Sequence, residues 1–134
     1  MSKLTSTPMV MSLDMLRKLG YYAEPVEHRP YFPGMERSTT TRDLLGFADI
    51  LALREHVLLV QTTSRSNVSA HMKKIQASVA FEPCRRAGVL VHVHGWDVGG
   101  VQVTDMTARD ADGNFVYRVL WESILRAQKA MRFK

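Results

Sequence analysis

The sequence has one cysteine and lacks the features that mark membrane, secreted and nucleotide-binding proteins. Cys84 stands alone among 134 residues, which excludes an internal disulfide and suits a reducing cytosol. No apolar run approaches the ~20 residues that cross a bilayer. The opening MSKLTSTPMVMSLDML has no long apolar segment and no small-residue cleavage site. Walker-type loops, G-x-G-x-x-G motifs and nucleophile elbows are absent. We expect one cytoplasmic domain over residues 1–134, with no organic cofactor and no membrane partner.

The composition is that of an ordinary globular protein with an excess of basic residues. Hydrophobic residues make up 46% of the chain and charged residues 23%. The formal net charge of +5 and the pI near 9.7 favour a polyanionic partner, for which nucleic acid is the first candidate. The basic residues are spread along the chain, and a solvated surface explains each one taken singly.

The most informative stretch is RDLLGFADILALREHVLLVQTTS, residues 42–64. Two apolar, β-favouring runs, Phe47–Leu53 and Val57–Thr63, flank a short polar break, which predicts a buried β-hairpin. Asp49 opens the first strand, and Gln61 lies near the end of the second. An antiparallel hairpin brings these two positions close together. Because a strand has a period of two, Gln61 and Thr63 share one face.

A helix, an edge strand and a loop are expected before this hairpin. Ser12 is placed to cap a helix from Ser12 to Leu19. The segment Tyr21–His28 is typical of a short edge strand, because Pro25 cannot donate a hydrogen bond to a central ladder. Residues 29–41 hold prolines, a glycine and a Ser-Thr-Thr-Thr run, which indicates a loop. This loop either grips phosphates or is a solvated connector.

Further helices and strands are expected after the hairpin. They are a helix at Val68–Phe81, a strand at Val89–Trp96, a second hairpin of Val101–Thr107 and Phe115–Leu120 around an Asp110–Asn114 turn, and a helix at Glu122–Met131. In the first of these helices, the residues expected to face the sheet are Val68, Met72, Ile75 and Val79. The residues expected to end that segment are Pro83 and Gly88.

The hairpin resembles the core of the PD-(D/E)XK nuclease superfamily. Asp49-Ile50-Leu51-Ala52 is similar to the PD-hydrophobic-hydrophobic-Ala of archaeal-type Holliday-junction resolvases. Val60-Gln61-Thr62-Thr63-Ser64 stands where those proteins have (I/V)-E-V-K-S. Gln61 therefore replaces the acid and Thr63 replaces the lysine. The stretch is also similar to small nuclease-like proteins of phage genomes, which implies a bacterial or phage-infected host cytosol.

The resemblance implies a fold and a chemistry. The fold is α/β, a restriction-endonuclease-like three-layer core with the order αβββαβ, followed here by a C-terminal β-hairpin and helix. The activity is phosphodiester hydrolysis on DNA, branched or phage DNA included, with Mg²⁺ or Mn²⁺ as cofactor and a homodimer by analogy. The positions that would bind metal are Asp49, Gln61, Glu27 and Asp43. The positions that match or replace the catalytic ones are Asp49, Gln61, Thr63, Lys73 and Lys74.

Each of these positions also has a plainer interpretation. Asp49 can cap a turn at the start of its strand, and Asp43 can pair with Arg37 or Arg42. Lys73 and Lys74 can be a solvated helix face. The candidate nucleic-acid contacts, which can equally be helix caps and surface charges, are Arg37, Arg42, Arg65, Ser66, Asn67, Lys73 and Lys74.

Three functions therefore stay open. The first is an active nuclease. The second is a catalytically inactive module of the same fold that binds nucleic acid or a protein partner. The third is an accessory protein that docks through its apolar edge strand. His92 and His94 share one strand face and could bind Zn²⁺, but no Cys or His cluster accompanies them.

Overall fold

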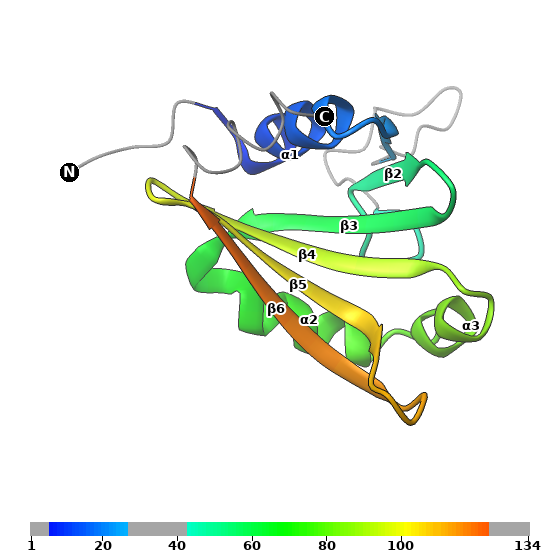
Figure 1. The fold of residues 1–134 in the computed structure, drawn as a ribbon. Coiled ribbons are helices and arrows are strands. Elements are labelled where there is room, and N and C mark those ends of the chain that lie inside the picture. Colours follow the sequence, from blue (N-terminus) through cyan, green and yellow to red (C-terminus); the bar gives the residue numbers. More distant parts are fainter. Residues whose placement is uncertain (1–5, 27–42, 124–134) are drawn as a thin grey trace, which may run out of the picture.

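A computed structural model of the protein describes residues 6–26 and 43–123, which form one six-stranded mixed sheet with helices on both faces (Figure 1). The strands follow each other across the sheet in chain order, from β1 to β6. Only β3 and β4 are parallel neighbours; the other pairs are antiparallel. The strands are β1 (Tyr22–Pro25), β2 (Ile50–Leu53), β3 (Val57–Ser64), β4 (Leu90–Asp97), β5 (Gly100–Arg109) and β6 (Phe115–Ser123). The helices are α1 (Pro8–Lys18), the 3-10 turn η1 (Arg65–Asn67), α2 (Val68–Gln76) and α3 (Phe81–Arg86). The expected α/β class is confirmed.

The sheet separates two apolar cores, and β3 contributes to both. Leu58 and Val60 belong to the core under α1, whereas Leu59 belongs to the core under α2 and α3. Figure 1 shows α1 on one side of the sheet and α2 on the other. Because side chains alternate along a strand, Gln61 and Thr63 follow Leu59 onto the α2 face. The period of β3 thus decides on which face the polar positions lie.

The first helix begins earlier than the sequence suggested. It starts at Pro8, and the N-cap is Thr7, whose hydroxyl accepts a hydrogen bond from the backbone N–H of Val10 at 3.3 Å. Thr-Pro is a favourable start, since proline is well tolerated at the first helical position. The prediction that Ser12 caps this helix is wrong. Ser12 lies inside α1 and is fully buried.

The helix expected at Val68–Phe81 is two helices with a turn between them. Val68 and Ile75 are buried and Met72 packs beside them, as predicted. Val79, however, lies in the turn and is 94% exposed, so its predicted core position is wrong. The helical period breaks after Gln76, and a residue beyond the break no longer faces the sheet.

The sequence suggested that Pro83 ends this helical segment, but it does not. It lies in the first turn of α3, where its missing N–H costs nothing. Cys84 in the same helix is buried and reduced.

The remaining elements follow the predictions, with shifted ends. β1 is at the sheet edge, as expected, but is shorter than Tyr21–His28. The predicted loop 29–41 lies outside the described residues. β5 and β6 form the second hairpin, whose turn is held by Asp110 Oδ1 accepting the N–H groups of Asp112 and Asn114 at 2.9 Å.

The helix predicted at Glu122–Met131 does not begin at Glu122. β6 runs to Ser123 and so includes the first two residues of that predicted segment; its other residues lie outside the described ranges. Within residues 6–26 and 43–123, no helix has the length and apolar character to cross a bilayer.

Candidate functional site

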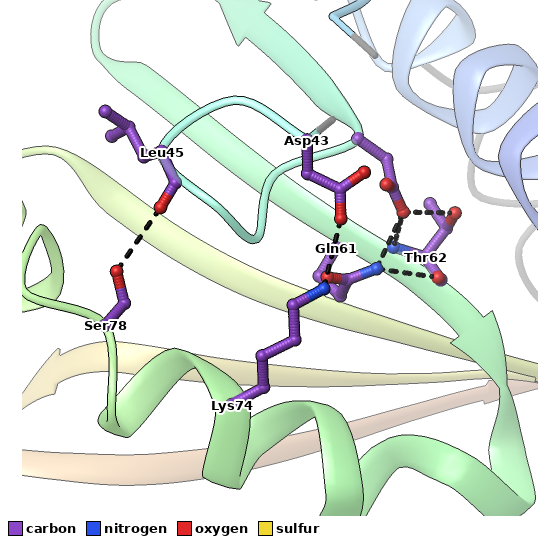
Figure 2. A network of polar contacts seen from close by, with 7 residues as sticks. Asp43, Leu45, Gln61, Thr62, Lys74 and Ser78 are labelled. Carbon is purple, nitrogen blue, oxygen red and sulfur yellow. Dashed lines mark hydrogen bonds and ion pairs between the residues drawn. The ribbon is translucent and has the colours of Figure 1, made fainter. Parts of the chain in front are cut away.

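The hairpin of β2 and β3 places Asp49 directly beside Gln61. The backbone N–H of Asp49 donates to the carbonyl of Val60 at 2.8 Å, and Ile50 is paired with Val60. The next position along each strand therefore brings Asp49 opposite Gln61. The Gln61 side-chain Nε2 donates to Asp49 Oδ2 at 2.8 Å (Figure 2). The expectation that the hairpin joins these two residues is confirmed.

The Asp49 carboxylate is buried and heavily hydrogen-bonded. It is 4% exposed. Besides Gln61, its Oδ2 accepts the backbone N–H of Thr62 at 2.9 Å and the Thr62 hydroxyl at 3.0 Å. Burial raises the pKa of Asp49 to about 7, the Thr62 N–H opposes this rise, and the adjacent Asp43 carboxylate adds to it. Near neutral pH the site therefore gains from a proton or a cation that offsets the buried charge.

A tight turn before β2 brings Asp43 to the same place. Lys74 Nζ from α2 contacts Asp43 Oδ2 at 3.1 Å (Figure 2). The turn is closed by Leu44 and Ala48, which exchange two backbone hydrogen bonds of 2.9 Å. The Asp43 carboxylate is close enough to Asp49 to raise its pKa by charge and by hydrogen bonding. Residues separated by more than thirty positions, Asp43 and Lys74, thus complete a polar cluster around Asp49.

The polar cluster consists of Asp43, Asp49, Gln61, Thr62 and Lys74. Three of its members, Asp49, Gln61 and Asp43, were predicted metal ligands, and Lys74 was one of two candidate replacement lysines. Lys73, the other, is exposed and makes no hydrogen bond or ion pair within the described residues. Thr63 is buried on the same sheet face, two residues further along β3. The other predicted positions, Glu27, Arg37 and Arg42, lie outside the described residues.

The predicted nucleic-acid contacts of η1 are engaged with one another and with β4. Asn67 Nδ2 donates to Ser64 Oγ at 3.1 Å, and Ser64 Oγ and Ser66 Oγ lie 3.3 Å apart. Ser64 and Asn67 occupy the N-cap positions of η1 and α2, as the capping interpretation expects, but neither side chain makes a capping hydrogen bond. Arg65 forms an ion pair with Asp97 at 3.1 Å. These residues remain exposed or half-buried at the end of β3.

His71, which was not among the predicted site residues, lies near this cluster on α2. It precedes Lys74 by three residues, the spacing that puts two side chains on one helix side. Its Nδ1 is buried and, within the described residues, has no hydrogen-bond partner. Burial lowers the pKa of His71, the Lys74 charge lowers it further and Asp43 opposes the change. The signal available in the sequence was the spacing of three residues between His71 and Lys74.

The histidines of β4 have a structural use. His94 is buried, and its Nδ1 lies 2.8 Å from Ser12 Oγ, which also accepts the indole N–H of Trp96 at 2.8 Å. Burial lowers the pKa of His94 to about 3, so its ring is neutral. His92 lies on the same face, and its Nε2 is 3.6 Å from Asp105. The Ser12–His94–Trp96 contact anchors α1 to the sheet.

Metal-binding groups of the usual composition are absent from the described ranges: no three His, Cys, Asp or Glu side chains lie together there. Oxygen donors at the polar cluster come instead from two carboxylates and one amide. Gln61 Oε1 is buried and has no hydrogen-bond partner within the described residues. Carboxylate and amide oxygens are ligands that Mg²⁺ and Mn²⁺ accept. The cluster therefore offers a small set of hard oxygen donors.

No protein-family model matches this sequence, and no curated protein shows significant similarity to it.

Proposed function

We propose that this protein is a metal-dependent nuclease that hydrolyses phosphodiester bonds in DNA, with a restriction-endonuclease-like core of the PD-(D/E)XK type. The observation that carries the proposal is the buried Asp49 carboxylate, held against Gln61 and beside Asp43. These residues face α2 at the centre of the sheet. The geometry agrees with a strand-borne aspartate and a second ligand on the next strand.

The topology supports the same proposal. The order helix, three antiparallel strands, helix, parallel strand runs from α1 to β4. This is the αβββαβ order that the sequence resemblance implies. β5 and β6 extend the sheet beyond β4.

The residues present fit a divalent cation. Asp49, Asp43 and the unpartnered Gln61 Oε1 would hold it, since hard cations accept carboxylate and amide oxygens. A bound cation would neutralise phosphate charge and acidify a water ligand. It would also replace the proton that burial favours on Asp49. Thr63 cannot supply the positive charge of the lysine it replaces. Lys74 lies 3.1 Å from Asp43, where its charge would stabilise an anionic phosphate.

A second candidate is a nucleic-acid-binding module without catalysis. It is favoured because both carboxylates of the cluster already have partners within the protein. Gln61 already satisfies one oxygen of Asp49, and Lys74 already neutralises Asp43. A site completed by its own side chains needs no cation. The two candidates therefore differ in whether a divalent metal binds at all.

Cleavage assays on branched, duplex and single-stranded DNA, with Mg²⁺ or Mn²⁺ against EDTA, test the proposal. The key variant is Asp49→Asn, which keeps an acceptor for the Thr62 hydrogen bonds and removes the charge. Asp14→Asn is the matched control, because Asp14 is exposed on α1 and, among the described residues, pairs only with Lys18. We expect metal-dependent cutting by wild type and Asp14→Asn, and a loss of at least 100-fold in Asp49→Asn. No cutting by wild type, with salt-sensitive DNA binding intact, would favour the binding module.

A further inference from the structure

The two edges of the sheet differ in how well they are protected against pairing with another strand. β1, at one edge, is four residues long and ends at Pro25. A short edge strand that contains proline is a poor template for a further strand, because proline has no N–H to donate. β6, at the other edge, is nine residues long and contains neither proline nor glycine (Figure 1). We call this side of β6 the open edge.

The exposed side chains at the middle of β6 are mostly apolar. Tyr117 is 41% exposed, Val119 58% and Leu120 49%. Because side chains alternate along a strand, Tyr117 and Val119 lie on one face of the sheet and Leu120 on the other. The Gln76 side chain of α2 donates to the Tyr117 hydroxyl at 2.8 Å, which identifies the first face as the α2 face. Apolar side chains thus flank the open edge on both faces, with the exposed Arg118 among them.

The backbone of the open edge is also available for pairing. Within the described ranges 6–26 and 43–123, β6 has one neighbouring strand, β5. The backbone N–H and C=O groups that point away from β5 have no strand to bond to there. A long, apolar edge strand of this kind is a template for a strand of another chain.

The sequence of β6 is complementary to itself when two copies run antiparallel. In a pair related by a twofold axis, if position i of one copy is opposite position j of the other, then j is also opposite i. With the axis at Leu120, position 118 of each copy is opposite position 122 of the other. These positions hold Arg118 and Glu122, which carry opposite charges. Opposite charges directly across a sheet stabilise the pairing, whereas like charges destabilise it.

Registers with the axis one or two positions earlier lack this match. An axis at Val119 places Arg118 opposite Leu120, and an axis at Arg118 places two arginines opposite each other. An axis halfway between two residues is excluded, because directly opposed residues must lie on the same face of the sheet. The charges of β6 therefore favour pairing about Leu120 over these alternatives.

We propose that β6 pairs antiparallel with β6 of a second copy of this chain, with the twofold axis at Leu120, so that the two sheets join into one. The two Leu120 residues then meet at the axis, and an Arg118–Glu122 pair of positions lies on either side of it. The proposal does not depend on the proposed nuclease function. β6 also lies outside the αβββαβ segment on which the family resemblance rests.

The association state of the purified protein tests the proposal. Size-exclusion chromatography with light scattering, over a range of concentrations, gives the dimer dissociation constant, and we expect wild type to form dimers. Leu120→Lys places two like charges at the axis, and Arg118→Glu places two acids opposite each other twice. Each should raise the dissociation constant at least about 10-fold. Both residues are exposed, so thermal unfolding should show that each variant still folds.

The decisive variant is the charge exchange Arg118→Glu/Glu122→Arg, which restores opposite charges in the proposed register. It should return the dissociation constant to within about 3-fold of the wild-type value, because the coupled pair is rebuilt. Lys73→Glu is the matched control, since it reverses one charge at an exposed position of α2 and not of β6. It should dimerise like wild type.

The other outcomes would overturn the proposal. A wild type that stays monomeric at every concentration would leave the open edge to a different protein. A dimer that neither Leu120→Lys nor Arg118→Glu weakens would use another surface. Weakening by Arg118→Glu without recovery in the charge exchange would reject the register and the proposal with it. None of these measurements involves cleavage, so a β6-dependent dimer that never cuts DNA would support the inference and refute the nuclease.

Discussion

Gln61 donates its side-chain N–H to the Asp49 carboxylate across 2.8 Å, at the position where the proposed nuclease relationship would place a second acid. Two carboxylates at this distance would repel each other in a buried setting, whereas an amide binds the carboxylate. The protein therefore has a more stable metal-free site than a two-acid arrangement would give. We therefore expect the site to bind a cation with lower affinity than a two-acid site would.

Replacing this amide by an acid should reverse that balance. We expect Gln61→Glu to lower the free energy of unfolding in EDTA by roughly 1–3 kcal/mol, because it removes a hydrogen bond and adds a buried charge. Saturating Mg²⁺ or Mn²⁺ should restore much of this loss, since the cation binds the folded state. Denaturant unfolding with and without metal measures both effects. Gln102→Glu, beside Arg65, is the control; an equal metal response in both variants would contradict the assignment.

Lys74 should matter for cleavage and Lys73 should not. Lys74 contacts Asp43 at 3.1 Å, whereas Lys73 has no partner within the described residues. We expect Lys74→Met to reduce metal-dependent cleavage at least 10-fold, because it removes the cation that lies beside the Asp43 carboxylate. Lys73→Met should change it less than about 3-fold, apart from a smaller salt dependence of DNA binding. The rates of the two variants at one salt concentration decide the point, and equal losses would reject the role of Lys74.

Asp49 should make the protein less stable as the pH rises. Its pKa is raised from 3.8 to about 7 in the folded state, so the folded protein holds a proton that the unfolded chain loses between these values. Stability from this group is full below pH 3.8 and is lost as the pH rises through about 7. Asp49→Asn should therefore gain about 1–3 kcal/mol relative to wild type between pH 4 and pH 8. Urea unfolding across this range is the measurement. A stability difference between Asp49→Asn and wild type that does not change with pH would show that the pKa of Asp49 is not raised.

His94 should produce the opposite dependence. Its pKa is lowered from 6.5 to about 3, so the unfolded chain binds a proton in this window that the folded protein excludes. The stability due to neutral His94 is present above pH 6.5 and is lost as the pH falls toward 3, by at most about 1.4 kcal/mol per pH unit. In the Asp49→Asn background, His94→Gln should flatten the fall in stability between pH 6.5 and pH 4. An unchanged slope would mean that other groups bind these protons.

The glycine at position 95 should be essential for docking the second helix. A Cβ at Gly95 would overlap Val68 Cγ2 and lie 3.1 Å from the Arg65 Cα. Gly95→Ala should therefore lower the unfolding free energy by about 1–3 kcal/mol, because η1 and α2 must move away from β4. Val68→Ala removes the nearer contact, so the double variant should lose less than the sum of the two single losses. Full additivity in denaturant unfolding would show that the helix accommodates the methyl group elsewhere.

Local pattern was sufficient for the hairpin and for its central contact. The polar break between two apolar runs placed β2 and β3, and the period of two placed Gln61 on the α2 face, opposite Asp49. The same signals missed the start of α1 at Thr7-Pro8 and the break after Gln76. At both places a local preference for a helix start or a helix end competes with the helical period. A prediction based on the period alone therefore fails there.

What the sequence by itself determined is therefore the order of the strands, the pairing within the two hairpins and the meeting of Asp49 with Gln61. These follow from turn residues and side-chain periods, which act over a few positions. The tertiary structure alone decided that Lys74 reaches Asp43, and that Ser12 bridges His94 and Trp96 more than eighty residues away. Such contacts depend on where each helix packs against the sheet. That packing results from the summed burial of both apolar cores, which no short segment of the chain encodes.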